Sequence, residues 1–524
     1  MSGARAVDAE VRDAYDRVPY PSGSIHSSHP DNLATRALLL GLEPPDLQRV
    51  RVLELGCSDG GNLIPMASEL PAGRFLGIDL SPRQITDGQR RLEALGIANV
   101  ELREMSLLDA GGSLGEFDYV IAHGVYSWVG PEVQEALLRI CRECLAPAGV
   151  AYVSYNALPG WHQRLIAREM MTYHTRGIAD PYERADRALG VLDLVAGAAA
   201  GDVYSSLLRE RLAQLSEHRD RPSYVIHEYL EESNEPVWFH QFMARAGRHG
   251  LQYLADADTP LAEIEMLPAE VQARLRALAP GRLELEQALD FVVDRTFRRS
   301  LLCRQGPPVE LAMVPERIER LHAASSLKPE SPAPDVRSTA GEPFRGERDR
   351  AITVSHPPVK ALLVALAGPW PRALPFADLR GRVQDLLGGT VEEGLLADML
   401  FSLYCGGLLD LHLLPPRCTE TVSERPRTSE LARREAALSP YVTNARRRIL
   451  KLDDDFARVL LQHLDGTRDR AALREVLAGE VAAGRLAITR DGEPLLDPEQ
   501  RSPFLDALLE QTLRKMAGLA LLAA

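Results

Sequence analysis

Residues 50–67 read VRVLELGCSDGGNLIPMA, which places a glycine-containing loop directly after an apolar, strand-like run. The run ends at Glu54 and Gly56, a short polar loop contains Gly60 and Gly61, and the following residues have a helical pattern. A strand, a glycine loop and a helix in this order form the ligand-binding unit of many α/β domains. The stretch therefore predicts a loop that holds a phosphate, holds another adenosine cofactor, or is empty.

The strand–helix pattern continues beyond this loop. Strand-like runs are RVLELG, RFLGIDL, NVELREM, FDYVIAHG and GVAYVSYN, and helical segments such as SPRQITDGQRRLEALG lie between them. Strands that alternate with helices predict a Rossmann-like, doubly wound and mostly parallel sheet, with helices on both faces. A ligand of such a sheet is expected at the carboxyl ends of its strands.

The spacing of the glycines argues against a phosphate-binding loop. A dinucleotide fingerprint reads G-x-G-x-x-G and a P-loop ends in GK[ST], whereas this loop reads Gly56-x3-Gly60-Gly61. S-adenosylmethionine carries no phosphate, and it needs close backbone approach at glycines and an acid for its ribose hydroxyls. Asp79 lies about twenty residues after Gly60, as a ribose-binding acid does, and Glu54 suits the ammonium group of the cofactor. The loop therefore favours S-adenosylmethionine, and an empty crevice is the alternative.

Length and composition indicate a multidomain protein without a disulfide framework. A chain of 524 residues is expected to hold two to four domains. The formal net charge of -14 argues against nucleic acid or an anionic membrane as the main partner. The six cysteines are scattered, and Cys141 and Cys144 are spaced CxxC within a helical pattern, so we expect ordinary thiols and no metal.

The amino-terminal sequence MSGARAVDAEVRDAYDRV has charges throughout and no apolar core. We therefore expect no secretory signal. No window approaches the roughly 18 apolar residues of a membrane helix. These features predict a cytoplasmic protein without membrane insertion.

Changes in pattern along the chain predict five segments. They are an amino-terminal helical lid segment (1–45), the cofactor-binding α/β domain (46–165), a helical middle domain (166–322), a Pro- and Ser-rich linker (323–349) and a helical, winged-helix-like region, with two units, at 350–524. Each unit of the last region has three helices and a small wing, and the second contains a predicted hairpin that turns on Asp491-Gly492.

Arg446, Arg447 and Arg448 precede this second winged-helix-like pattern. A DNA contact is one interpretation. The acidic chain and the short cluster favour a solvated helix face or a protein-docking surface instead.

The chain resembles class I S-adenosylmethionine-dependent methyltransferases in ELGCSDGGNL, GIDLS and FDYVIAHGVYSWV. It is similar, more specifically, to the bacterial group with a methyltransferase regulatory domain, typified by rickettsial outer-membrane-protein lysine methyltransferases. This closer resemblance is carried by YDRVPYPS, SHPDNLATRALLLGL, VAYVSYNALPGW, SYVIHEYLEESNEPVWFHQF and DFVVDRTFRRSLLCR. It implies methyl transfer to lysine ε-amino groups of a protein, with an outer-membrane or surface protein as the expected substrate class.

The resemblance also implies a set of cofactor contacts. Many methyltransferases place an aspartate after the third strand to contact the adenine amino group, but this chain has Ser106 there and Asp109 three residues on. We therefore expect the backbone of Met105 and Ser106 to contact adenine. The complete expected set is Glu54, Gly56, Cys57, Gly60, Asn62, Asp79, Leu80, Gln84, Met105, Ser106 and His123.

Methyl transfer requires orientation and a dry site, and it requires no metal. A lysine acceptor must be neutral when it attacks, and an aromatic, largely uncharged channel lowers its pKa by desolvation. Residues of this type follow the fourth and fifth strands and lie on the amino-terminal segment. The expected catalytic set is His123, Tyr126, Tyr155, Asn156, Trp161 and Tyr20, with Trp128 nearby.

These residues also have structural interpretations. Trp128 and Trp161 are equally suited to packing, and His123 to a hydrogen-bonded structural role. Tyr155 and Asn156 can cap the strand end. His26 and His29, near Tyr20 on the lid segment, are expected to be loop residues and not a metal pair.

The segment HEYLEESNEPVWFH carries four carboxylates within eight residues. A solvated helix end followed by a loop is the simpler interpretation. The alternative is an acidic rim that steers a basic substrate toward the cleft.

Three other functions remain open. The chain can act on a small metabolite or natural product, or bind the cofactor as a sensor without turnover. A transcription factor that uses the carboxyl-terminal wings is the third. Protein-lysine methyl transfer is the favoured function because of the resemblance.

Overall fold

The computed structural model describes residues 12–13, 15–19, 22–198, 201, 203–217, 222–258, 260–306, 308–309, 314–347, 350–487, 489–490, 493–494 and 498–523. The chain divides into two compact units. The first comprises Met1–Gly23, Gln48–Asp258 and Ile264–Pro307, and the second comprises Ser24–Leu47, Thr259–Glu263 and Pro308–Ala524.

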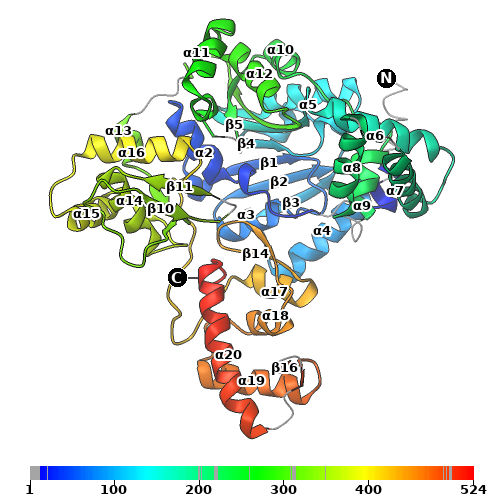
Figure 1. The fold of residues 1–524 in the computed structure, drawn as a ribbon. Coiled ribbons are helices and arrows are strands. Elements are labelled where there is room, and N and C mark those ends of the chain that lie inside the picture. Colours follow the sequence, from blue (N-terminus) through cyan, green and yellow to red (C-terminus); the bar gives the residue numbers. More distant parts are fainter. Residues whose placement is uncertain are drawn as a thin grey trace. The chain divides into compact units, whose positions relative to one another are not determined.

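The first unit is built on a seven-stranded sheet among the described residues, with the order β3-β2-β1-β4-β5-β7-β6 (Figure 1). The strands are β1 (Arg51–Leu55), β2 (Arg74–Asp79), β3 (Val100–Glu104), β4 (Phe117–Ala122), β5 (Leu145–Asn156), β6 (Leu251–Asp256) and β7 (Phe297–Arg304). The pairs among β1 to β5 are parallel, while β7 is antiparallel to both β5 and β6. The predicted doubly wound, mostly parallel sheet is confirmed.

The boundary of the predicted middle domain is wrong, because β6 and β7 complete the sheet of the α/β domain. The sequence analysis expected residues 166–322 to form a separate helical domain. The strand signal of β7 is hidden because two arginines follow Phe297 in its pattern FRRSLLCR, and one of them, Arg298, is buried in the structure. A buried arginine is read from sequence as a surface residue.

Helices pack against the sheet, and one of them has a side-chain cap at its start and a glycine at its end. Helices α3 (Leu63–Glu69), α4 (Pro82–Leu95), α5 (Pro131–Cys144) and α10 (Phe239–Arg248) contact its strands. At α4 the Ser81 side chain accepts a hydrogen bond from Gln84 N, and Gly96 ends the helix in the left-handed conformation. The side chains of α5 and α10 pack with those of β1, β2, β4 and β5 in one hydrophobic core.

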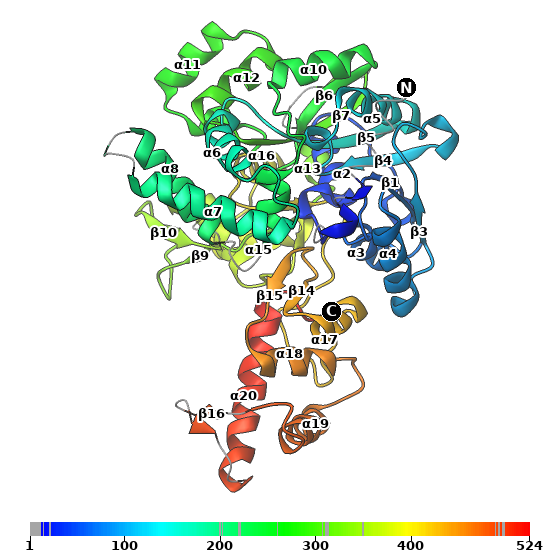
Figure 2. The ribbon, with the colours of Figure 1, turned by 90° about the vertical axis from the view of Figure 1, so that its right-hand side faces the viewer.

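A helical layer follows β5 in the chain. It contains α6 (Trp161–His174), α7 (Pro181–Ala198), α8 (Val203–Ser216), α9 (Pro222–Val225) and a π-helix (Ile226–Leu230), which share a second core. Figure 2 shows α7 and α8 side by side. Helices α11 (Ala269–Leu278) and α12 (Arg282–Val292) come between β6 and β7.

The cysteine prediction is confirmed for the thiols. Cys141 and Cys144 lie buried in α5, and all six cysteines are free and buried. Within the described ranges, no group of three or more His, Cys, Asp or Glu side chains is arranged to hold a metal ion. None of the helices in these ranges has the length and apolar character needed to cross a membrane.

Residues 323–349 do not form the predicted linker. They contain or border β8 (His322–Ala324), β9 (Lys328–Pro329) and β10 (Glu342–Arg345), and β10 pairs with β11 (Ala351–Val354). Leu327, Val336 and Phe344 are buried in the core of the second unit. The sequence interpretation failed because a few spaced apolar residues anchor a segment that is otherwise rich in Pro, Ser and charge.

The second unit contains two hydrophobic cores. The first includes α2 (Pro30–Leu39), α13 (Pro315–Ile318), α14 (Pro357–Ala367), α15 (Phe376–Leu387), α16 (Glu393–Cys405) and the strands β12 (Leu374–Pro375) and β13 (Asp410–His412). The other includes α17 (Glu430–Leu438), α18 (Asp455–Gln462), α19 (Arg470–Ala482), α20 (Pro498–Gly518) and the hairpin of β14 (Tyr441–Thr443) and β15 (Ile449–Lys451). Figure 1 shows α20, in red, alongside α18 and α19. The second of these cores lies within the predicted region 350–524, whereas the first also takes side chains from α2, α13 and residues 321–344.

The predicted hairpin near the carboxyl terminus is present. Strands β16 (Thr489–Arg490) and β17 (Glu493–Pro494) pair antiparallel. The expected turn residues, Asp491 and Gly492, lie outside the described residues.

The arginine cluster before α18 is structural, so the interpretations as a DNA contact, a solvated helix face or a protein-docking surface are wrong for two of its three members. Arg446 and Arg447 are buried. Arg446 pairs with Asp410 and lies 4.2 Å from the Trp370 ring centroid, and Arg447 Nη1 donates to Asp31 Oδ2 at 2.7 Å. The third member, Arg448, is half-buried. Although burial opposes it, Arg447 holds the pKa of Asp31 well below its usual range.

Candidate functional site

The glycine loop leaves β1 in a conformation that requires glycine at two positions. Gly56 and Gly60 have φ values of +71° and +75°, a region that side chains with a Cβ rarely adopt. A Cβ on Gly56 would also lie 2.5 Å from Val125 Cγ2. The backbone N–H groups of Gly56 and Cys57 both donate to Ile78 O, at 2.8 and 3.1 Å. The loop is therefore fixed to the end of β2.

Glu54, at the end of β1, is a buried carboxylate that lacks a cation. Its Oε1 accepts from Asn62 Nδ2 at 2.8 Å, and its Oε2 has no hydrogen-bond partner within the described part of the chain. Burial, together with the nearby Asp79 and Asp59, raises the pKa of Glu54 to about 8. A positively charged ligand group next to Glu54 would remove this penalty. The residues here fit the ammonium group of S-adenosylmethionine.

Asp79 ties the glycine loop to the start of α4. Its Oδ2 accepts from Ser58 N at 2.8 Å and its Oδ1 accepts from Ser81 N at 2.9 Å. Burial raises the pKa of Asp79. The carboxylate lies at the carboxyl end of β2, the position that the sequence analysis expected for the ribose-binding acid.

The other expected cofactor residues divide into two groups. Leu80, Met105 and Ser106 are half-buried at the ends of β2 and β3, and Met105 N donates to Asp79 O at 2.8 Å. Cys57 and Gln84 are buried. The Cys57 side chain points toward Gly77, whose added Cβ would lie 2.7 Å from its Sγ, so the thiol packs against β2.

His123 follows β4. In the sheet, β1 lies between β4 and β2, the strand that ends at Asp79. His123 is half-buried, and its Nδ1 lies 2.9 Å from the Tyr152 hydroxyl. The ring also makes an edge contact with Phe297. Burial, and then Arg299, lower the pKa of His123 to about 3. The imidazole is therefore neutral near pH 7 and is a weak base, so hydrogen bonding suits it better than proton removal.

Three of the expected catalytic residues are not at the site. Tyr126, Tyr155 and Trp161 are fully buried in the core. Tyr155 packs 4.2 Å from Phe242, between ring centroids, and its hydroxyl lies 2.9 Å from Ser300 Oγ. These side chains are packing anchors, because aromatic residues supply most of the apolar area of such a core.

Asn156 and Trp128 lie near the carboxyl ends of β5 and β4, as predicted. Asn156 ends β5, and its backbone N–H donates to Ser127 Oγ at 2.9 Å. Trp128 is half-buried and packs edge-on against Trp161. Tyr20 lies outside the described residues.

The amino-terminal segment contacts the crevice, as a lid would. The Ser81 hydroxyl donates to Asp16 Oδ1 at 2.5 Å, and Ser22 Oγ bonds Asp59 of the glycine loop. A Cβ on Gly61 would lie 2.7 Å from the Ser22 carbonyl carbon. This segment therefore covers the loop after β1.

The two histidines of the predicted lid belong to the second unit instead. His29 caps α2 by accepting from Asp31 N at 3.1 Å. Burial lowers the pKa of His26 to about 3.

The acidic segment after the π-helix crosses the ends of β4 and β5. Glu235 N donates to Ser127 O at 2.8 Å, and Val237 N donates to Asn156 O at 3.0 Å. Glu231 pairs with His227 at 2.7 Å, whereas Glu232 and Glu235 are exposed. Half of the four carboxylates are thus available to a substrate.

Two residues of the site were missed by sequence reasoning. Tyr152 could have been found, because the alternation in VAYVSYN puts it on the same face of β5 as Asn156. Asn234 could not, because no local signal connects the loop 231–238 to the end of β5. Its Oδ1 accepts from Asn156 Nδ2 at 3.1 Å.

Comparison with protein-family models identifies three domains in the chain. The model described as "Methyltransferase domain" matches residues 53–151. The "Predicted methyltransferase regulatory domain" matches residues 221–304, and "PKMT, C-terminal winged helix domain" matches residues 424–521. The winged-helix prediction is therefore confirmed for the last part of the chain.

Comparisons with whole proteins agree with these domains. The uncharacterized protein RP789 of Rickettsia prowazekii is 30% identical over 520 residues, which are 97% of this chain and 93% of that protein. The structure of PKMT2 from Rickettsia typhi in complex with AdoHcy is 30% identical, with a TM-score of 0.86, and the match covers 97% of this chain and 100% of that one. A second structure of PKMT2 from Rickettsia typhi matches with a TM-score of 0.85. The chain therefore belongs to the family of S-adenosylmethionine-dependent methyltransferases that joins a methyltransferase domain, a methyltransferase regulatory domain and a PKMT winged-helix domain.

Proposed function

We propose that the chain transfers methyl groups to lysine ε-amino groups of a protein substrate. The similarity to PKMT2 over 97% of the chain, winged-helix domain included, is the observation that carries this proposal. The exposed Glu232 and Glu235 at the ends of β4 and β5 suit a substrate that brings a positive charge. An outer-membrane or surface protein is the proposed substrate class, on the resemblance of the sequence motifs.

The cofactor supplies a methyl group on a positively charged sulfur, which an amine displaces in line. Glu54 is proposed to bind its ammonium group, Asp79 its ribose hydroxyls, and the backbone of Met105 and Ser106 its adenine. The backbones of Gly56 and Gly60 are proposed to lie beside it, in the left-handed conformation that glycine allows. The remaining proposed contacts are Cys57, through its backbone, Asn62, Leu80, Gln84 and His123.

The residues after β4 and β5 are proposed to orient the acceptor. His123 is held by Tyr152 and stays neutral, so it adds no positive charge that would repel a lysine. Phe297 contributes an aromatic edge to the same place. These uncharged groups favour the neutral amine, which is the form that attacks, and the positive charge of Arg299 beside them disfavours the ammonium form as well.

Binding of S-adenosylhomocysteine is expected to release a proton from Glu54. Without ligand this carboxyl has a pKa of about 8, so it is mostly protonated at pH 7. Pairing with the ligand's ammonium group lowers that pKa and frees close to one proton. Calorimetry at pH 7 in buffers of different ionisation enthalpy measures this release, and Glu54→Gln should abolish it. Equal release by the two proteins would contradict the assignment.

The same carboxyl gives the ligand-free protein a predictable pH dependence. Its pKa rises from 4.5 in the unfolded chain to about 8 in the fold. The protonated form therefore stabilises the fold below pH 4.5, and this contribution is lost as pH rises through about 8. Between pH 4.5 and about 8, the melting temperature of the wild type should therefore decline more than that of Glu54→Gln, which lacks this carboxyl.

Incorporation of tritiated methyl groups tests the proposed function. Wild type and Asp79→Ala are incubated with labelled S-adenosylmethionine and with whole-cell or outer-membrane protein extract. Label in a protein band that is absent with the variant is expected. Label confined to the small-molecule fraction would overturn the proposal in favour of a metabolite substrate. No label, despite measured cofactor binding, would overturn it in favour of a sensor.

A further inference from the structure

The loop 231–238, which contacts the end of β5, contains an amide donor without a hydrogen-bond partner in the described part of the chain. Asn234 Oδ1 accepts from Asn156 Nδ2 at 3.1 Å. Asn234 Nδ2 is buried and has no hydrogen-bond partner among the residues that the structure describes. A buried donor without a partner is costly, and native structures rarely leave one without a functional or structural reason.

Asn234 is held firmly in this place. Ser127 binds Asn156, the partner of Asn234, and Glu235, the next residue in the chain. Its Oγ accepts from Asn156 N and its carbonyl accepts from Glu235 N. Val237 N donates to Asn156 O at 3.0 Å, which fixes the other end of the loop. The amide of Asn234 is therefore positioned at the carboxyl ends of β4 and β5, the edge that also carries His123.

We infer that Asn234 Nδ2 donates a hydrogen bond to a main-chain carbonyl of the polypeptide substrate. This inference depends on the proposed function, because it requires a protein acceptor. A lysine ammonium offers only donors and cannot satisfy Nδ2, whereas every peptide unit near the lysine offers a carbonyl oxygen. Asn234 thus recognises the chain that carries the lysine, and it acts in binding and not in the methyl-transfer step.

The charges around Asn234 agree with such a substrate. Glu232 and Glu235 lie on either side of it in the sequence and are exposed. They attract the positively charged lysine as the substrate chain approaches. A carbonyl held by Asn234 would then fix the position of the chain relative to the amine.

The variant Asn234→Asp tests this role with the smallest change of shape. An aspartate can still accept from Asn156 Nδ2, but it replaces the donor with an acceptor. The apparent KM for outer-membrane protein extract, measured by methyl incorporation, should rise about tenfold. The kcat and the affinity for S-adenosylhomocysteine should stay within about twofold of wild type, because neither involves this donor. The added charge alone would attract a lysine-bearing chain and lower KM, so it cannot cause the expected rise.

Two further variants complete the experiment. Asn234→Ala removes the donor without adding charge and should raise KM similarly. Ser233→Ala, in the same loop, is the matched control and should behave as wild type. An unchanged KM in both Asn234 variants would overturn the inference, as would a loss confined to S-adenosylhomocysteine affinity, which would assign the amide to the cofactor. If wild type labels no protein, the proposed function itself fails, and this result is distinct from the others.

Discussion

Replacing Asp79 with alanine is expected to weaken S-adenosylhomocysteine binding by at least about 100-fold. The carboxylate accepts from two backbone N–H groups, those of Ser58 and Ser81, and is proposed to accept from the ribose hydroxyls as well. A hydrogen bond to a charged group contributes about 1.5–3 kcal/mol, so the loss of two such bonds to the ligand gives a factor of about 10²–10⁴. Titration calorimetry measures the affinity directly.

A matched control separates the ligand site from the helix that follows it. Asp87 lies on the exposed side of α4, where it pairs with Arg90 at 2.9 Å. Asp87→Ala should bind S-adenosylhomocysteine as wild type does, because an exposed pair contributes little. If Asp79→Ala retained its affinity within about threefold, Asp79 would not be the ribose-binding acid.

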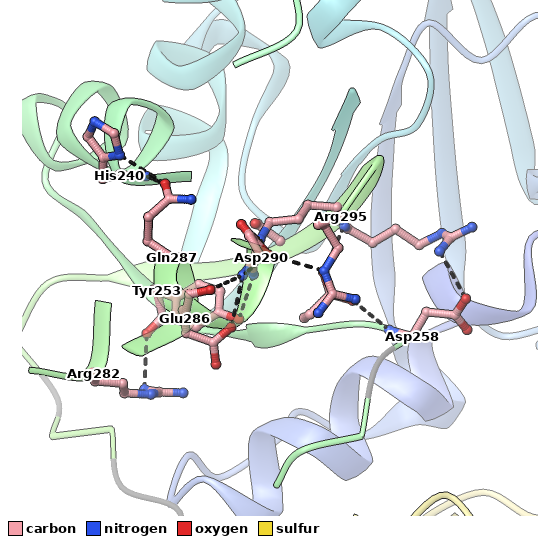
Figure 3. A network of polar contacts seen from close by, with 12 residues as sticks. His240, Tyr253, Asp258, Arg282, Glu286, Gln287, Asp290 and Arg295 are labelled. Atoms are coloured by element: carbon pink, nitrogen blue, oxygen red, sulfur yellow. Dashed lines mark hydrogen bonds and ion pairs between the residues drawn. The ribbon is translucent and has the colours of Figure 1, made fainter. Parts of the chain in front are cut away.

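Replacing Asp290 with alanine is expected to cause the largest loss of stability in the first unit. Asp290 is fully buried and accepts from Arg298 Nη2 at 2.8 Å and Nε at 2.9 Å (Figure 3). Arg295 Nε also donates to it at 3.1 Å. Its removal leaves Arg298 buried with an incomplete set of partners, which costs about 3–5 kcal/mol. For a unit of this size the melting temperature should fall by roughly 10 °C.

The melting temperature of the first unit can be followed by tryptophan fluorescence. Three of the four tryptophans, Trp128, Trp161 and Trp238, belong to it. The double variant Asp290→Leu, Arg298→Met should recover part of the loss, since an apolar pair of similar volume needs no charge partners, although Arg295 still loses its bond to Asp290. A fall of less than about 2 °C in Asp290→Ala would show that this network does not hold α12 against β7.

The sequence predicted the parallel half of the sheet well, because its strands are buried and apolar and its loops carry glycine. It failed at β7, where Arg298 enters the core through its pairs with Asp290 and Glu286. Ion pairing across the sequence is invisible to a local pattern. The same cause made Arg446 and Arg447 look like surface residues, although both are buried by pairs with distant aspartates.

The candidate site was predicted unevenly for a similar reason. Glu54 and Asp79 follow from the position of strand ends, which a sequence pattern locates to within a residue or two. Tyr155 was misplaced because neighbouring residues of a strand point to opposite faces, and its hydroxyl contacts Ser300 in the core. Asn234 reaches Asn156 across 78 positions of sequence, and only the folded chain brings them together.

Amino-acid analysis of the labelled protein tests the central claim most directly. Protein methylated by the wild-type chain with tritiated S-adenosylmethionine is hydrolysed in acid, and the labelled residues are separated by chromatography. We predict that the label elutes with Nε-methylated lysines and is absent when Asp79→Ala replaces the wild type. Label that mild base releases, as from a methyl ester, or that elutes with another methylated amino acid, would contradict lysine as the acceptor.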